Sequence, residues 1–308
     1  MTARAFVRFA WITLGLTLLV IVWGAVVRAT GSGAGCGSHW PLCNGDVVPL
    51  APATTTLIEY VHRLTSGVVM LLAVALVVGA YRAFPAGHRA RTWAWASLVF
   101  MLIEAAVGAG LVLLGLVEGN TSMLRAAYIA VHLTNTMLLV AAMTGTIWWA
   151  SQPAARSAAP ILRSPGLAMT LLALLVVAAT GAVVALGNTL FPSASLAEGL
   201  AADFDASSHI LIRLRAFHPV LAVVVAAALL VQTRRDPTFR TPHGHALGPI
   251  VVTLVLAQAG LGVINLLMLA PITLQMTHLL GSNLLWMAVV WAWLSGTGVQ
   301  GYRVQGPS

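Results

Sequence analysis

The fold class follows from residues 57–82, which read LIEYVHRLTSGVVMLLAVALVVGAYR. A helix needs about 20 mostly apolar residues to cross the hydrocarbon core of a bilayer, and this stretch is long enough to do so. Seven further stretches meet the same criterion. The eight predicted spans cover about residues 7–27, 57–82, 93–116, 126–149, 167–188, 210–232, 247–269 and 273–295. The sequence therefore predicts an all-α membrane protein with eight transmembrane helices.

The composition of the whole chain agrees with this fold class. Of the 308 residues, 59% are hydrophobic and 8% are charged, whereas about 25% are charged in an ordinary soluble domain. So few charges could not cover the surface of a soluble globule of this size. The composition therefore excludes a cytosolic enzyme, a soluble nucleic-acid-binding protein and a disordered chain.

Membrane orientation explains the net charge of +8. Arginine and lysine concentrate on the cytoplasmic side of membrane proteins. Eleven of the 16 basic residues fall on one side of the predicted spans: Arg4, Arg8, Arg82, Arg89, Arg91, Arg156, Arg163, Arg234, Arg235, Arg240 and Arg303. We therefore expect a multi-pass plasma-membrane protein with both termini in the cytoplasm and the long loops 29–56 and 189–209 outside. No nucleic-acid partner is expected.

An internal repeat divides the chain near its midpoint. Four features of the first half recur in the second at offsets of 157, 154, 156 and 146 residues: Gly24-Ala25-Val26-Val27 as Gly181-Ala182-Val183-Val184, Glu104 to Gly108 as Gln258 to Gly262, His62 as His218, and His132 as His278. Parallel repeats are related by an axis along the membrane normal. We predict two tandem four-helix bundles related by a pseudo-two-fold axis in that direction. Residues 1–150 form the first half, 151–166 a cytoplasmic linker and 167–308 the second half.

Four histidines occupy matched positions inside the predicted spans, near their outer ends. A single intramembrane histidine most often forms a hydrogen bond to a neighbouring helix. Here each half carries one histidine on its second helix and one on its fourth. Two imidazoles facing each other across a bundle can supply the two axial ligands of a haem iron, whereas zinc requires a closer group of four ligands. The sequence predicts one bis-histidine haem site per half, formed by His62 with His132 and by His218 with His278.

A carboxylate distinguishes the first half from the second. Glu59 precedes His62 by three residues, which places both on one face of a helix. The equivalent residue of the second half is Arg215. This difference suggests that the first half carries out chemistry and the second holds a cofactor. The alternative for Glu59 is a salt bridge with Arg63 or Arg28 near the membrane boundary.

The two cysteines, Cys36 and Cys43, lie seven residues apart in the first predicted outer loop, which reads GCGSHWPLC over residues 35–43. A disulfide is the default on the oxidising side of the membrane. At this point the bond could serve either as a structural link or as a redox-active group.

The chain resembles the haem A synthase family over nearly its whole length. The motifs that carry this resemblance are RATGSG at 28–33, WPLCNG at 40–45, EYVHR at 59–63, His132-Leu133, His218 and His278. The resemblance implies oxidation of the C8 methyl group of haem O to a formyl group in two hydroxylation steps. The product, haem A, is a cofactor of terminal oxidases.

The resemblance also implies a role for each site residue. His62 and His132 would bind the substrate haem O, His218 and His278 would hold haem b, Glu59 would be the essential acid, and Cys36 and Cys43 would form a disulfide. The implied partners are haem O, haem O synthase, an electron donor of unspecified kind and the lipid bilayer. The sequence does not fix the oligomeric state, and a homo-oligomer is one alternative.

The chain departs from the family pattern at two positions. Pro219 follows His218, where the family often has an arginine, and this bears on how haem b is seated. Glu104 stands where a glutamine is usual, and we expect it to form a hydrogen bond between helices.

Three other functions share some of these features. A di-haem electron-transfer protein of the cytochrome b type would use the same histidine pairs without Glu59 or the cysteine loop. A transporter would bind no haem, and a thiol oxidoreductase centred on the cysteines would work without the four histidines. Identifying the extracted pigment would separate these alternatives from haem A synthase.

Overall fold

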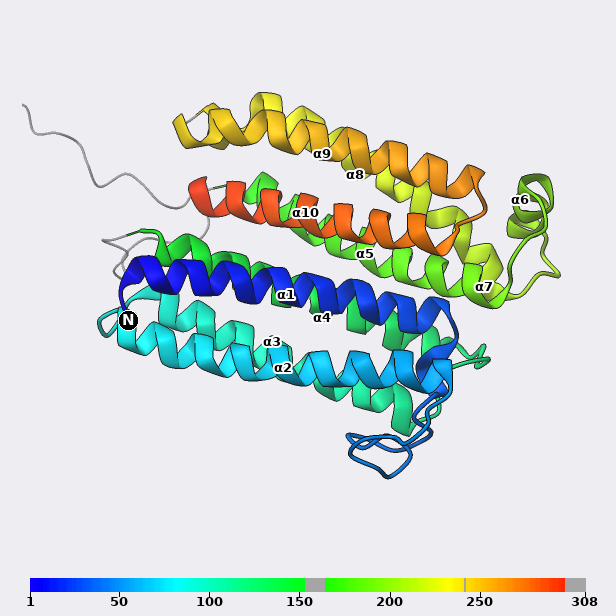
Figure 1. Cartoon of the computed structure of the whole chain (residues 1–308). Helices are drawn as coiled ribbons and strands as arrows, with labels where there is room; N and C mark the ends of the chain where they lie inside the picture. The colour runs from blue at the N-terminus through cyan, green and yellow to red at the C-terminus, as the bar shows by residue number, and fades with distance from the viewer. Residues whose placement is uncertain (153–163, 241, 297–308) are drawn as a thin grey trace, which may run out of the picture.

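The computed structural model describes residues 1–152, 164–240 and 242–296. Within these ranges, eight helical segments are long and apolar enough to cross a membrane, as predicted. They run side by side along a common direction (Figure 1). Seven of them are single helices: α1 (Ala3–Ala29), α2 (Thr54–Ala83), α3 (Arg89–Leu113), α4 (Met123–Ala150), α5 (Pro165–Leu190), α9 (Pro242–Leu267) and α10 (Ile272–Gly296). Most of the predicted linker 151–166 lies outside the described residues, as do Arg156, Arg163 and Arg303.

The sixth span, Ile210–Arg235, is interrupted near its beginning. It consists of α7 (Ile210–Arg213), the 3-10 helix η2 (Leu214–Ala216) and α8 (Phe217–Arg235). Pro219 has no backbone N–H, and its ring would clash with the carbonyl of Arg215 in a continuous α-helix. A short 3-10 segment relieves this conflict. The departure at Pro219 therefore changes the backbone just before His218.

The second long loop contains a helix that the sequence analysis did not predict. Residues 189–209 were predicted only as a long loop, but α6 (Leu196–Phe204) lies within them. The Ser195 hydroxyl accepts a hydrogen bond from the backbone N–H of Glu198 at 3.2 Å. Serine followed three residues later by glutamate is the capping-box pattern that begins many helices. The signal for α6 was therefore present in the sequence.

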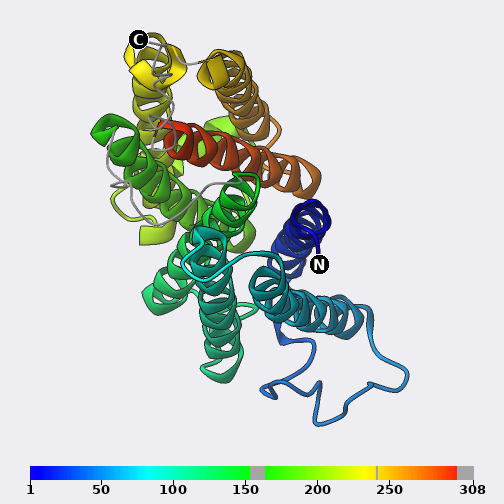
Figure 2. The same ribbon diagram turned by 90° about the vertical axis from the view of Figure 1, so that its left-hand side faces the viewer.

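The spanning helices pack in two groups, which lie one above the other in Figure 1. Helices α1 to α4 contact one another, and so do α5, α8, α9 and α10. Helix α4 joins the groups, since it packs against α5 and α10 as well as α1 and α3. The separation of the two groups is also visible in the turned view (Figure 2). The pseudo-two-fold axis and the domain boundaries at residues 150 and 167 stay predictions.

Large apolar side chains cover the outward faces of the helices. Leu71 of α2 and Met169 of α5, for example, are each 70% exposed. An apolar surface this extensive is not stable in water, but it suits contact with lipid. The chain is therefore a multi-pass membrane protein.

We call one end of the helices the loop end. It carries the connections 30–53, 114–122, 191–209 and 268–271. The arginine-rich connections lie at the opposite end. All features of the candidate site lie at or near the loop end.

Candidate functional site

The four repeat-matched histidines lie in the part of each helix nearest the loop end. His62, His132 and His278 fall within the first three turns of α2, α4 and α10, and His218 is the second residue of α8. The structure thus places one pair in each group of helices.

Two of these histidines lie against glycines at which a larger residue would displace the ring. A Cβ added to Gly24 of α1 would lie 2.8 Å from Cε1 of His62, and one added to Gly181 of α5 would lie 2.9 Å from Cε1 of His218. Real Cβ atoms essentially never approach another heavy atom so closely. Glycine at each position therefore leaves room for an imidazole ring between two helices.

The other two histidines also face glycines of the preceding spanning helix. A Cβ on Gly262 of α9 would lie 3.3 Å from Cε1 of His278, a tight contact. One on Gly108 of α3 would lie 3.9 Å from Cε1 of His132, an ordinary van der Waals distance. All four glycines belong to the sequence repeat, although the repeat alone did not indicate that they contact the histidines.

The spacing of the second pair matches that expected for two imidazoles bonded to one metal. The ring centroids of His218 and His278 lie 6.5 Å apart, and two imidazoles bonded to one metal by bonds of about 2 Å have centroids roughly 6 Å apart. Nδ1 of His218 lies 3.2 Å from the Val177 carbonyl oxygen and 3.2 Å from the Thr180 hydroxyl. If the ring proton is on Nδ1, Nε2 is free to bind iron.

A carboxylate lies beside one ring of the first pair. Oε1 of Glu104 is 3.3 Å from Nδ1 of His132. Oε2 accepts a hydrogen bond from the Asn135 amide at 2.6 Å, and the Thr136 hydroxyl donates to Oε1. Glu104 of α3 therefore forms hydrogen bonds to α4, as expected from the sequence.

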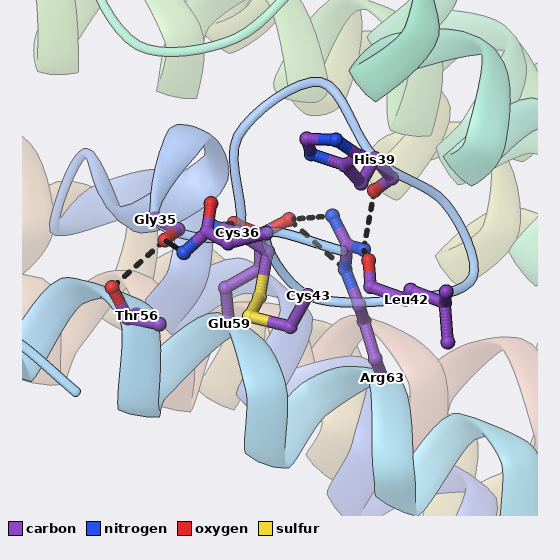
Figure 3. The surroundings of a disulfide bond; sticks show 9 residues. Gly35, Cys36, His39, Leu42, Cys43, Thr56, Glu59 and Arg63 are labelled. Atoms are coloured by element: carbon purple, nitrogen blue, oxygen red, sulfur yellow. Dashed lines mark hydrogen bonds and ion pairs between the residues drawn. A yellow bond between two sulfur atoms is a disulfide. The ribbon is translucent and has the colours of Figure 1, made fainter. Parts of the chain in front are cut away.

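The loop that connects α1 and α2 is attached directly to α2. Cys36 and Cys43 are joined by a disulfide, and the backbone N–H of Cys36 donates to Oε2 of Glu59 at 2.7 Å. The Thr56 hydroxyl donates to the Gly35 carbonyl at 2.8 Å. Figure 3 shows the disulfide above the helix that carries Glu59. The loop is thus fixed one turn before His62.

Arg63 reinforces this attachment. Its Nη2 and Nε donate to Oε1 of Glu59 at 2.6 and 3.1 Å, and its Nη1 donates to the carbonyl oxygens of His39 and Leu42 at 2.6 Å each (Figure 3). The salt bridge between Glu59 and Arg63, one of the alternatives drawn from the sequence, is therefore present. Both oxygens of the buried Glu59 carboxylate face donors from the loop and from Arg63.

Comparison with known proteins identifies the family. A family model described as cytochrome oxidase assembly protein matches residues 7–290. This match covers nearly all of the chain. The chain belongs to the cytochrome oxidase assembly protein family.

Several curated proteins resemble the chain to different extents. A "Protoheme IX farnesyltransferase" of Thermus thermophilus is 45% identical over 293 residues, which are 92% of this chain and 47% of that protein. The "Heme A synthase" of Exiguobacterium sp. is 41% identical over 103 residues, 33% of this chain and 34% of that protein. The "Heme A synthase" of Alkalihalophilus pseudofirmus is 40% identical over 98 residues, 32% and 33% respectively. The chain spans about half the length of the Thermus relative.

In this family member, the second long loop is also anchored just before a site histidine. Here the anchor is an ion pair. Nη2 of Arg215 lies 2.8 Å from Oδ1 of Asp203, which belongs to α6. Arg215 also donates to the Asn188 side chain and the Phe191 carbonyl, at 3.3 and 3.2 Å. The residue three positions before a histidine thus anchors a loop in both groups of helices. The sequence did not indicate this role for Arg215, because Asp203 is distant along the chain.

Proposed function

We propose that the chain is a haem A synthase, which oxidises the C8 methyl group of haem O to a formyl group by successive hydroxylations. The observation that carries this proposal is the pair of imidazoles in each group of helices, each ring lying against a glycine. Family membership and the relatives named heme A synthase support the same reaction. The product would supply terminal oxidases with their cofactor.

The two sites have different roles in this proposal. His62 and His132 hold the substrate haem O, and His218 and His278 hold haem b. Bound haem iron supplies one-electron and oxygen chemistry. The asymmetry at Glu59 and Arg215 supports placing the reaction in the first group of helices.

Glu59 is the proposed catalytic carboxylate. Oxidation of a methyl group requires proton movement and creates electron-poor carbon. A buried carboxylate can accept a proton or stabilise positive charge. The Cys36 amide and Arg63 hold Glu59 in a fixed orientation one turn before His62, so the disulfide loop is part of the same site.

We place the protein in the plasma membrane with both termini in the cytoplasm and the loop end outside. Alkaline phosphatase is active only after export, so a fusion following Val48 should be active and a fusion following Pro85 inactive. The opposite pattern would reverse the proposed orientation. Haem O synthase is the proposed source of substrate. With molecular oxygen as the oxidant, each hydroxylation would place one oxygen atom on the methyl carbon and reduce the other to water with two electrons from a reductant.

The test of the function is the haem content of a host that makes haem O but no haem A. Expression of the wild-type chain should produce haem A. The His62→Ala variant should produce none while retaining haem b, because the two sites are separate. If wild-type protein yields haem b alone, the di-haem electron carrier would replace the synthase as the better assignment.

The name of the Thermus relative makes farnesyl transfer a second candidate. Enzymes that act on diphosphates commonly bind Mg²⁺ through carboxylates. Within the described spanning helices the acidic residues are Glu59 and Glu104, and both already accept hydrogen bonds. Expression in a host that lacks haem O but supplies farnesyl diphosphate separates the two activities. Formation of haem O there would favour the transferase.

A further inference from the structure

Arg28 reaches from the first group of helices into the second. Its Nη1 donates to the Ala185 carbonyl and the Thr189 hydroxyl of α5, both at 2.6 Å, and its Nη2 donates to Oε1 of Gln275 on α10 at 2.9 Å. These three acceptors are neutral. Among the ion pairs of the described residues, none involves Arg28.

The contacts of Arg28 place it beside the second histidine pair. Ala185 follows Gly181, the glycine against His218, by four residues, and Gln275 precedes His278 by three. Residues three or four apart lie on one face of a helix. Ala185 lies nearer the loop end than Gly181, and Gln275 lies nearer it than His278. The guanidinium therefore lies about one helical turn beyond the His218–His278 pair.

The positive charge at this position has no local counter-charge. Arg28 is half-buried, and a cation withdrawn from water is costly unless an anion compensates it. The other arginine near this pair, Arg215, is already paired with Asp203. Arg125 of α4, a further arginine near the loop end, donates its hydrogen bonds to the carbonyl oxygens of Glu118 and Asn120. This environment favours an anionic ligand.

We propose that Arg28 binds a propionate carboxylate of the haem held between His218 and His278. This assignment rests on the proposed haem site of the second group of helices. The planar guanidinium can donate two parallel hydrogen bonds to a carboxylate, which replace its bonds to neutral acceptors. Helix α1 of the first group thereby completes the cofactor site of the second.

The test compares two forms of the same porphyrin. Full-length protein carrying His62→Ala, which leaves only the second site, is titrated with iron protoporphyrin IX and with its dimethyl ester. Binding is followed by the absorption spectrum of bis-histidine haem. The ester cannot accept the charge-assisted bond, so protein with Arg28 should bind the free acid about tenfold or more tightly. Arg28→Gln should lose this preference.

Matched variants separate a direct contact from a general effect. Thr189→Val removes one acceptor of Arg28 but keeps the guanidinium, so the preference should persist. Arg125→Gln should also keep the preference for the free acid over the ester. If Arg125→Gln loses as much of this preference as Arg28→Gln, direct contact is overturned in favour of a general effect of positive charge. Equal affinity for acid and ester in the protein that retains Arg28 would overturn the assignment even if Arg28→Gln does not fold. Absence of any bis-histidine spectrum would instead overturn the haem site itself, and the role of Arg28 with it.

Discussion

At the scale of single residues, the site depends on side chains that are absent as much as on those that are present. Gly24 and Gly181 leave space that His62 and His218 fill. A glycine inside a helix normally weakens it by comparison with alanine. Here this loss of helix stability is offset, because the imidazole ring of the histidine can approach the backbone of the glycine's helix.

We predict that Gly24→Ala displaces the His62 ring. The added Cβ would lie 2.8 Å from Cε1, and such overpacking costs about 1–3 kcal/mol. Haem O bound by the first group of helices, measured by absorption titration, should weaken by about tenfold or more, while the second-site spectrum is retained.

Gly15→Ala is the matched control for this prediction. Gly15 lies on the same helix, and a Cβ there would meet nothing within 4 Å. Its haem binding should equal that of the wild type. Equal behaviour of the two alanine variants would show that the contact with His62 does not limit binding.

We predict that Glu59→Gln keeps haem b and binds haem O but makes little haem A, whereas Glu59→Asp retains some activity. The amide cannot take up a proton as a carboxylate can. Haem extraction and chromatography after expression with haem O measure the products. The hydroxylated intermediate is expected to accumulate in Glu59→Gln.

Arg63→Gln tests whether Glu59 acts only by fixing the loop. This variant removes the ion pair and the bonds to the His39 and Leu42 carbonyls, but it leaves the carboxylate. It should retain more haem A synthesis than Glu59→Gln. Equal losses would show that Glu59 serves as a salt-bridge partner and has no chemical role of its own.

At the scale of elements, helix ends decide several local features. The Ser195 cap begins α6 within a loop, and Pro219 divides the sixth span before His218. His88 caps the beginning of α3, as Ser195 caps that of α6. Its Nδ1 accepts a hydrogen bond from the backbone N–H of Ala90 at 3.2 Å. Its ring stacks on Phe84 with centroids 4.3 Å apart.

We predict that protonation of His88 destabilises the turn between α2 and α3. Burial, aided by the charge of Arg91, lowers the pKa of His88 despite a hydrogen bond with the Gln152 backbone. The folded chain therefore favours neutral His88, and stability should fall as the pH drops below the unfolded value of about 6.5.

Thermal unfolding in detergent between about pH 7.5 and about pH 5 measures this effect. His88→Asn keeps a side-chain acceptor for the cap but does not titrate. The wild type should therefore lose more of its Tm on acidification than His88→Asn. Parallel curves for the two proteins would contradict a role for His88.

At the scale of the whole molecule, the two groups of helices are joined through α4 and α10. Nε1 of Trp286 donates to the Met137 carbonyl at 2.6 Å in a buried position. Trp286 also belongs to the apolar core that includes α1 to α4. The contact between the groups therefore contains both packing and a hydrogen bond.

We predict that Trp286→Phe lowers the stability of the whole protein by about 0.5–1.5 kcal/mol, the typical net contribution of one hydrogen bond. Thermal unfolding in detergent measures the change. Trp95→Phe is the control, since Trp95 is 47% exposed and donates to Tyr81 of the same group. A loss no larger than that of the control would show that the Trp286 bond does not stabilise the contact.

The number and approximate limits of the spans could be predicted from the sequence, because apolar length is a local property of the chain. It also identified the four histidines, because the repeat places them at matched positions. Helix α6 was not predicted, although Ser195 followed three residues later by Glu198 is a sequence pattern that begins helices.

The contacts between residues of different helices became known only from the tertiary structure. The contacts of Gly24 with His62, Arg215 with Asp203 and Arg28 with Gln275 depend on how each helix is rotated about its axis and placed against its neighbours. Apolar faces are nearly continuous in a membrane helix, so hydrophobic periodicity does not fix that rotation. Packing between small residues and hydrogen bonds between helices fixes it instead, and these appear only when the helices are assembled.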